Sequence, residues 1–367
     1  MLSKISALLL AFTFVLNANR YMCQLELEIE ITNDDNSDIN TDDLKSSRLD
    51  IEDNDNINEY ANEYANEYAN AYPYPIVLLH GITSDKTELT TVANWLMEKL
   101  PNKVYNIEIG NGKMDSIFKT MDWQLNELCY QIYNIPELEN GFHFIGMSQG
   151  GLLARGYVER CNKFPVQNLI TWVSPQSGVY GIGNISGLDI NFKNIYTPIY
   201  QNIYSFSGYW KDPYRYEKYL GSASYLPYLN NERNPQNTLT SYDLLDDNWE
   251  TIDFESIEWD PEKNKVNMLS LKNFVMIWSP NDDVICPPES GKFSFYDTKS
   301  NHAIKANELL PIIDLFESEQ YIKDFIGLRT LYESNRLHIL ETNCTHTGHK
   351  TQECFPQLEK LTFPFLV

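Results

Sequence analysis

The feature that most constrains the fold is an alternation of short apolar runs and amphipathic segments that begins at residue 75. Continuous apolar runs bounded by turn residues are typical of strands that are buried on both faces of a sheet. Residues 75–80 form such a run, and further strands are predicted at residues 104–109, 142–146, 168–173, 273–278 and 336–341. Segments with apolar residues three and four positions apart separate them, which predicts βαβ units and a mostly parallel sheet with helices on both faces.

The same spacing predicts where the helices lie. We expect helices over residues 89–100, 117–132, 150–160 and 312–331, and a final amphipathic stretch at 355–361. Residues 178–262 break the alternation, because they are rich in Gly, Asn, Tyr and Pro and have little periodicity. We interpret them as an insertion over the sheet, a cap or lid within a folded domain of residues 73–367.

The charge of the chain is concentrated in one segment. Of 51 acidic and 28 basic residues, 15 acidic and 2 basic ones lie between residues 24 and 72, which end in the repeat NEYANEYANEYANAY. This composition predicts a disordered acidic segment over residues 20–72, either a linker or a partner-binding arm. A net charge of −23 argues against nucleic acid as a partner and against adhesion to anionic lipid through a basic patch.

The first 19 residues have the pattern of a secretory signal peptide. Lys4 precedes an apolar run over residues 5–16, and Ala18 is a small residue ahead of a cleavage point. The alternative is a membrane anchor, but the run is shorter than the roughly 20 residues that span a bilayer. We therefore expect a mature chain without a membrane span that follows the secretory route.

The motif that carries chemistry is GMSQGG, residues 146–151, between a predicted strand and a predicted helix. G-x-S-x-G in this context is the nucleophile elbow of the α/β-hydrolase fold, a sharp turn that holds the serine hydroxyl at the sheet edge. Gly146, Gly150 and Gly151 lack side chains that would clash where the helix approaches the strand. Ser148 is therefore the candidate nucleophile.

A serine nucleophile needs a base, and the base needs a carboxylate that orients it. In this fold the order along the chain is serine, acid, histidine, with each residue after a later strand. Asp282 and Asp283 follow the strand at 273–278, and His346 and His349 follow the strand at 336–341. The residues alone predict a triad and leave both choices of acid and of base open.

The tetrahedral intermediate of acyl transfer needs two backbone N–H donors. We expect one from Gln149, directly after the nucleophile, and one from Ile82, in the loop after the first core strand. Gly81 lets this backbone come close, and His80 is given no role in proton transfer. Because no group of side chains has metal-ligand spacing, neither a metal nor a cofactor is predicted.

Several longer motifs carry a resemblance to a known family. They are HGITSD (80–85), GMSQGGLLAR (146–155), SPQSGVYG (174–181), YWKDP (209–213), LNNER (229–233), PNDDVICPPESGKFSFYD (280–297), IGLRTLYE (326–333) and THTGH (345–349). From about residue 75 to the C-terminus, the chain resembles the palmitoyl-protein thioesterases, most of all the lysosomal palmitoyl-protein thioesterase 2 type.

The resemblance implies an α/β-hydrolase that removes long fatty acyl groups from S-acylated proteins, peptides or acyl-CoA. It assigns Ser148 as nucleophile, Asp282 as orienting acid and His346 as base, with Asp283 and His349 as the alternatives. It also implies a lysosomal or secreted protein. The aromatic residues of the insertion then have two interpretations, an apolar groove for the acyl chain or packing of the lid.

The cysteines and sequons have expected partners and modifications. The resemblance implies a Cys129–Cys161 disulfide, and Cys344 and Cys354 bracket the histidine loop and are expected to pair. Cys23 and Cys286 are left without an assigned partner, and Cys286 is expected to be a buried thiol. The sequons at Asn184 and Asn343 are candidate glycosylation sites.

Two other functions compete with a thioesterase. A lipase or carboxylesterase would use the same triad on oxygen esters, and only the resemblance favours thioesters. An inactive hydrolase-fold protein could instead bind a partner through the acidic segment. The presence of candidates for all three triad positions argues against this second alternative.

Overall fold

The computed structural model describes residues 73–181, 192–233, 260–298 and 310–366. The chain divides into two compact units, Met1–Glu59 and Tyr60–Val367, and every described residue belongs to the second. The expected signal peptide, the acidic segment, Cys23 and the sequon at Asn184 lie outside the described residues.

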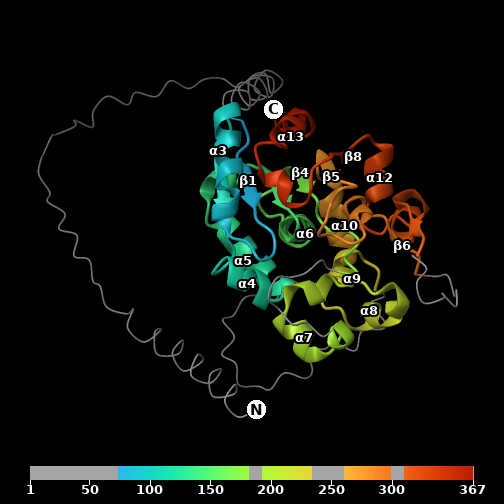
Figure 1. Ribbon diagram of the computed structural model, residues 1–367. Coiled ribbons are helices and arrows are strands. Elements are labelled where there is room, and N and C mark those ends of the chain that lie inside the picture. The colour runs from blue at the N-terminus through green and yellow to red at the C-terminus, as the bar shows by residue number, and fades with distance from the viewer. Residues whose placement is uncertain (1–72, 182–191, 234–259, 299–309, 367) are drawn as a thin grey trace, which may run out of the picture. The chain divides into compact units, whose positions relative to one another are not determined.

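Six parallel strands form the central sheet in the order β2-β1-β3-β4-β5-β8 (Figure 1). The strands are β1 (Ile76–Leu79), β2 (Val104–Ile107), β3 (Phe142–Met147), β4 (Val166–Trp172), β5 (Asn273–Trp278) and β8 (Leu337–Glu341). Each neighbouring pair runs in the same direction. All six predicted strands are present, with ends that differ by at most two residues, and the α/β-hydrolase class is confirmed.

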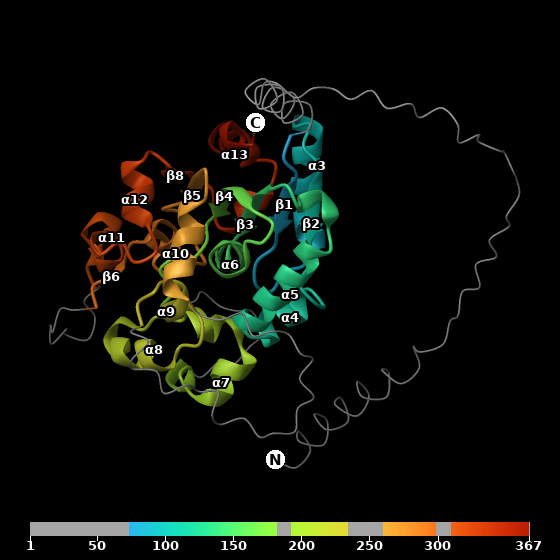
Figure 2. The same cartoon turned by 180° about the vertical axis from the view of Figure 1, so that it is seen from behind.

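The side chains of each strand divide between two hydrophobic cores, because successive residues of a strand point to opposite faces. On β1, Val77 and Leu79 enter one core, and Ile76 and Leu78 enter the other. Helices cover both faces, as the two opposite views show (Figures 1 and 2). The first core receives side chains from α5 (Met121–Tyr133), α6 (Gln149–Gly156), α10 (Pro261–Leu269) and α12 (Leu328–Glu333). The second receives side chains from α3 (Thr90–Lys99) and α13 (Phe355–Thr362).

Two predicted helices are divided, because side chains cap new turns inside them. The expected helix over residues 312–331 is wrong: this segment holds β7 (Ile312–Ile313), a 3₁₀ turn, α11 (Glu319–Ile322) and the start of α12. Ser318 Oγ accepts from the N–H of Tyr321 and begins α11. Likewise, Thr120 Oγ1 accepts from Trp123 N–H and separates α5 from α4 (Lys113–Phe118). The antiparallel pair β6 (Phe295–Tyr296) and β7 forms a second small sheet.

In the described residues of the insertion lie the short helices α7 (Pro198–Ile203), α8 (Tyr216–Ser222) and α9 (Leu226–Leu229), which lie together in both views (Figures 1 and 2). The insertion is fastened by buried charges. Arg155 of α6 donates to the carbonyl of Leu229 and to Asn230 Oδ1, and it pairs with Glu159 at 2.9 Å. These contacts join the helix after the elbow to the insertion.

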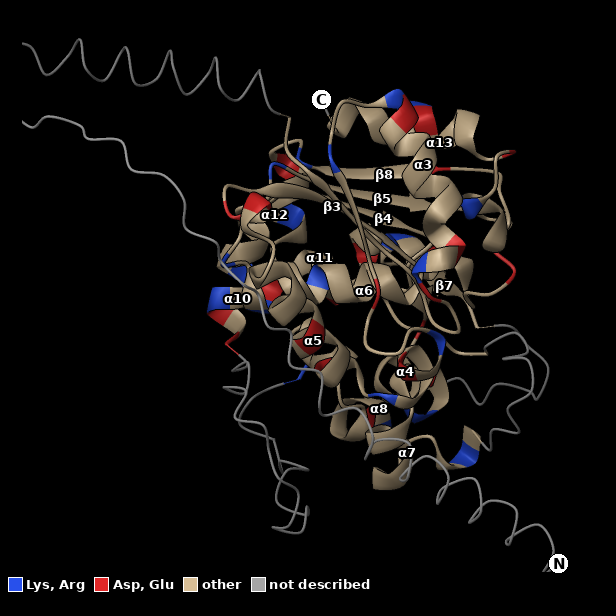
Figure 3. Cartoon of the chain, turned by 90° about the vertical axis from the view of Figure 1, so that its left-hand side faces the viewer, with Lys and Arg blue, Asp and Glu red and all other residues tan. Residues whose placement is uncertain are grey.

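Charged residues of the domain lie on its helices and loops, with both signs close together. The strands of the central sheet carry a single charged residue, Glu341. Acidic and basic residues are intermixed on α10, α12 and α13 (Figure 3). Within the described part of the chain, no helix has the length and apolar character to span a membrane.

Candidate active site

The turn between β3 and α6 brings a strand and a helix into close contact. A Cβ on Gly146 would lie 2.5 Å from the carbonyl oxygen of Gly150, and one on Gly151 would lie 2.5 Å from Ser174 Oγ. A Cβ on Gly150 would overlap the carbonyl oxygen of His80. These three positions therefore accept only glycine unless the neighbouring backbone or the Ser174 side chain moves.

Ser148 occupies the turn itself, in a conformation that residues other than glycine rarely adopt. Its φ is 56° and its ψ is −128°. Its N–H donates to the carbonyl of Trp172 at 2.9 Å, which ties the turn to β4. The side chain is 5% exposed, at the carboxyl edge of the sheet. A positive φ at the serine is the strained backbone geometry of a nucleophile elbow.

Asp282 and His346 meet at the same edge. His346 Nδ1 lies 2.9 Å from Asp282 Oδ2 and 3.0 Å from Oδ1, and both side chains are almost fully buried. The N–H groups of Val284 and Ile285 each donate to Asp282 Oδ1 at 2.9 Å, so the carboxylate is held in place. Since Asp282 accepts from Nδ1–H, the neutral imidazole has its lone pair on Nε2.

The structure therefore brings two of the three candidate residues into contact. Ser148 follows β3, while Asp282 and His346 follow β5 and β8, so all three lie at the carboxyl ends of strands. Among the described residues, no hydrogen bond joins Ser148 Oγ to His346. Such bonds often tighten only when substrate is present.

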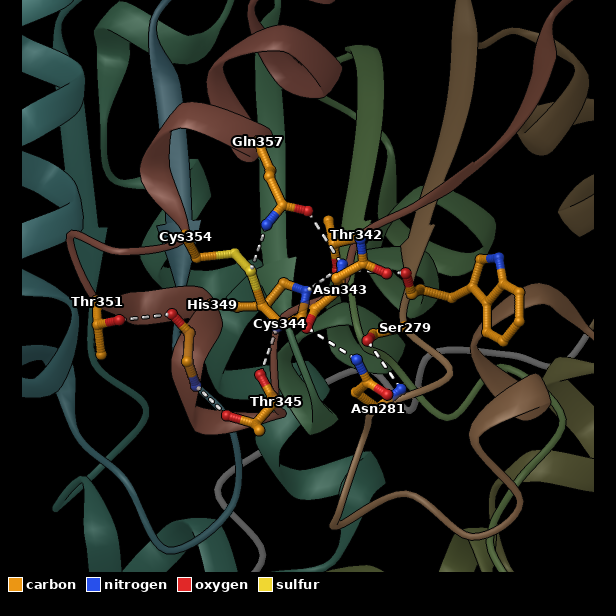
Figure 4. Close-up of a disulfide and its surroundings, with 12 residues drawn as sticks. Ser279, Asn281, Thr342, Asn343, Cys344, Thr345, His349, Thr351, Cys354 and Gln357 are labelled. Carbon is orange, nitrogen blue, oxygen red and sulfur yellow. Dashed lines mark hydrogen bonds between the residues drawn. A yellow bond between two sulfur atoms is a disulfide. The ribbon is translucent and has the colours of Figure 1, made fainter.

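The alternative acid and base have different contacts. Asp283 Oδ1 accepts from the backbone N–H of His346 at 3.1 Å, and its side chain does not reach the ring. His349 lies between Thr342 and Thr345 (Figure 4). Its Nδ1–H donates to the Thr345 carbonyl, and its Nε2 accepts from Thr342 Oγ1, each at 2.8 Å. His349 is fully buried, and burial lowers the pKa of its imidazole.

Of the two expected oxyanion donors, Gln149 follows Ser148 directly in the chain, and Ile82 follows a glycine that lies close to it. Gln149 is the first residue of α6, where a backbone N–H has no partner within the helix. On the other side, a Cβ on Gly81 would lie 3.3 Å from Ser148 Oγ, so the loop before Ile82 passes close to the hydroxyl. His80 stabilises this loop through Nδ1, 2.9 Å from the Gly81 carbonyl.

Sequence reasoning missed the contacts of the Gln149 side chain. Its amide meets Ser116, Gln124 and Tyr209, which lie on three separate segments. The only signal for any of them is Tyr209, which begins the YWKDP motif. Five aromatic residues of the insertion are buried in the first core: Phe206, Tyr209, Trp210, Tyr219 and Tyr225. For these five rings, burial in the core favours packing over an acyl-chain groove.

Both expected disulfides are formed. Cys129 of α5 pairs with Cys161, and Cys344 pairs with Cys354 across the loop that carries His346 (Figure 4). Cys286 is a free thiol but is half-buried rather than buried, with its sulfur 3.4 Å from the hydroxyl of Tyr296. Asn343 is exposed, and its glycosylation stays a prediction.

A buried histidine predicts that the domain loses stability in acid. His143 of β3 is 4% exposed, its Nδ1 is 3.1 Å from Asn168 Nδ2, and burial lowers its pKa to about 4. In the unfolded chain the same imidazole has a pKa near 6.5, so between pH 6.5 and pH 4 the unfolded state binds a proton that the folded state does not. The free energy of unfolding is therefore unaffected by this group above pH 6.5 and decreases as the pH falls toward 4. The full loss is roughly 3 kcal/mol.

The variant His143→Gln removes the titrating group. We expect its free energy of unfolding to fall less than that of the wild type between pH 7 and pH 4.5. Urea titrations at the two pH values measure this difference. Equal decreases for the two proteins would contradict the assignment of this acid sensitivity to His143.

Comparison with known proteins places this geometry in a family. Residues 75–346 match the family model described as palmitoyl protein thioesterase. Palmitoyl-protein thioesterase 3 of Dictyostelium discoideum is 39% identical over 80% of this chain and 92% of its own length. The lysosomal thioesterase PPT2 homolog of Drosophila melanogaster is 29% identical over 80% of this chain and 91% of its own.

Relatives of more than one type are thus similar to this chain. Lysosomal thioesterase PPT2-B of Xenopus laevis is a further one, 30% identical over 70% of this chain and 80% of its own length. Because the thioesterase 3 relative shares more identity than these two PPT2 relatives, resemblance to the PPT2 type stays a prediction. On its sheet, its motifs and these matches, the chain belongs to the palmitoyl-protein thioesterase family.

Proposed function

We propose that this protein is a serine thioesterase that hydrolyses long-chain fatty acyl thioesters. The observation that carries the proposal is the buried Asp282–His346 pair, at the same sheet edge as Ser148 on its strained turn. Membership of the palmitoyl-protein thioesterase family supports the choice of thioesters over oxygen esters.

The proposed cycle has two acyl transfers. His346 Nε2 takes the proton of Ser148 as Oγ attacks the thioester carbonyl carbon, and the N–H groups of Gln149 and Ile82 hold the oxyanion. When the C–S bond breaks, the leaving sulfur takes that proton and departs as a thiol. A water then gives a proton to His346 and attacks the acyl-serine carbonyl carbon. As the bond to Oγ breaks, His346 returns that proton to Ser148, and the fatty acid is released.

The leaving group suits this site. A thiol has a pKa near 8.5, so its sulfur needs less protonation during bond cleavage than an alkoxide does. Asp282 keeps the imidazole in the tautomer that accepts the serine proton and stabilises the imidazolium that follows.

The charge of the domain bears on which thioester is used. Residues 73–367 carry about half of the excess negative charge of the chain. An acyl-CoA is itself strongly anionic and needs a local basic patch to offset this repulsion. An S-acylated protein or peptide needs no such patch, so we propose it as the preferred substrate.

The proposed site of action is a lysosome or the extracellular space, reached through the secretory pathway. Several relatives are named lysosomal thioesterases. The two disulfides support this route, because such bonds persist in oxidising compartments. The proposal includes cleavage of residues 1–19 as a signal peptide.

A substrate panel tests the proposed function. Initial rates are measured on an S-palmitoyl peptide, palmitoyl-CoA and a matched oxygen ester, with Ser148→Ala as the control. We expect faster turnover of both thioesters than of the oxygen ester and almost none with Ser148→Ala. Preference for the oxygen ester would indicate a lipase or carboxylesterase. Absence of all three activities would favour a binding protein.

A further inference from the structure

The side chain of Gln149 is fully enclosed by hydrogen-bonding groups. It is 1% exposed, and its Nε2 donates to the Ser116 carbonyl at 2.9 Å and to Gln124 Oε1 at 3.1 Å. Its Oε1 accepts from the hydroxyl of Tyr209 at 2.9 Å. All three contacts fix the residue whose backbone N–H is the proposed oxyanion donor.

The direction of these hydrogen bonds is determined by two backbone carbonyls. Gln124 Nε2 donates to the carbonyls of Ser116 and Lys119, which can only accept. Gln124 Oε1 must therefore face the nitrogen of Gln149, and Gln149 Oε1 must face Tyr209. Tyr209 is consequently the donor, and burial raises the pKa of its phenol, so that the hydroxyl stays protonated.

Tyr209 belongs to the insertion, and its main chain is held independently of Gln149. Its carbonyl accepts from Val179 N–H at 3.1 Å, close to the end of β4. A Cβ on Gly178 would lie 2.7 Å from the same carbonyl, so the two segments are in close contact. Nearby, Ser205 Oγ donates to the Ser116 carbonyl at 2.8 Å. The main chain of Tyr209 is therefore held in place by contacts other than the one between its phenol and Gln149.

We propose that Tyr209 is a positioning residue for hydrolysis, which holds the Gln149 side chain and thereby aims the Gln149 backbone N–H at the oxyanion. This inference rests on the proposed function. It gives the insertion a part in the chemistry, because an element 60 residues away in the sequence sets the first turn of α6.

The variant Tyr209→Phe tests the inference in the full chain. We expect kcat to fall about tenfold with KM unchanged, because the oxyanion is absent from the bound substrate and develops only in the transition state and the tetrahedral intermediate, and because the donor is misdirected rather than lost. Tyr209→Phe should have no further effect on kcat when Gln149→Met is already present, since the phenol then has no side-chain amide to hold. The double variant should therefore match Gln149→Met alone.

Tyr225→Phe is the matched control. Tyr225 is also a buried tyrosine of the insertion, and its hydroxyl also donates to α6, at the Leu152 carbonyl 3.2 Å away. Among the described residues, no hydrogen bond joins its hydroxyl to Gln149. We expect a similar decrease in melting temperature for the two Phe variants and a lower kcat for Tyr209→Phe alone.

The outcomes separate the inference from the proposed function. Equal kcat values for the two Phe variants, with Ser148→Ala inactive, would overturn the role of Tyr209 and leave the proposed function intact. Full activity of Ser148→Ala would overturn both. Rates on a small activated acyl ester, which forms the same oxyanion, keep the comparison valid if thioesters are not the substrate.

Discussion

Replacement of His346 by alanine is expected to lower kcat by at least about 10⁴-fold, because loss of the base from a serine triad removes nearly all of its advantage over water. His346 is the histidine whose Nδ1 meets Asp282, at 2.9 Å, and whose Nε2 is then able to accept the proton of Ser148. Steady-state rates on an S-palmitoyl peptide measure the loss.

His349→Ala is the matched control for the same loop. We expect it to keep most of its turnover, because both ring nitrogens of His349 are engaged by Thr342 and Thr345. Its cost should appear in stability, since a buried side chain and two hydrogen bonds are lost. If His349→Ala were inactive and His346→Ala active, the base would be His349.

Asp282→Asn is expected to lower kcat by about 10⁴-fold at neutral pH, through the tautomer of His346. The N–H groups of Val284 and Ile285 both donate to Oδ1, so the asparagine must keep its oxygen at that position. Its NH₂ group then occupies the Oδ2 position, 2.9 Å from His346 Nδ1. Nδ1 also lies 3.0 Å from the retained oxygen, but that oxygen already accepts from two N–H groups. The new donor therefore favours the imidazole protonated on Nε2, which cannot accept the proton of Ser148.

Asp283→Asn separates this effect from a general loss of negative charge. Asp283 is exposed, and its Oδ1 accepts from the backbone N–H of His346 rather than from the ring. We expect kcat within a few-fold of the wild type, because an asparagine oxygen accepts the same hydrogen bond. Circular dichroism of both variants checks that the fold is intact. A greater loss for Asp283→Asn than for Asp282→Asn would transfer the orienting role to Asp283.

Much of the fold could be predicted because strand and turn signals are local. The buried runs, such as residues 273–278, identify strands by composition alone, and β5 has these bounds. The expected helix over 312–331 failed for a local reason of another kind. Its apolar spacing is helical, but Asp314 and Ser318 accept hydrogen bonds from backbone N–H groups and start new turns. Apolar spacing reports only which face of a helix would be buried, not whether a side chain caps a new turn inside it.

The sequence by itself determined a parallel α/β sheet, the elbow at Ser148 and the chain order of serine, acid and histidine, because these follow from periodicity and from what a sharp glycine turn permits. Only the tertiary structure decided which side chains meet. Asp282 and Asp283 are adjacent and chemically equal, and so are the two histidines of THTGH, until the loops after β5 and β8 direct them differently. The contact of Tyr209 with Gln149 depends on the path of the insertion, which no local pattern encodes.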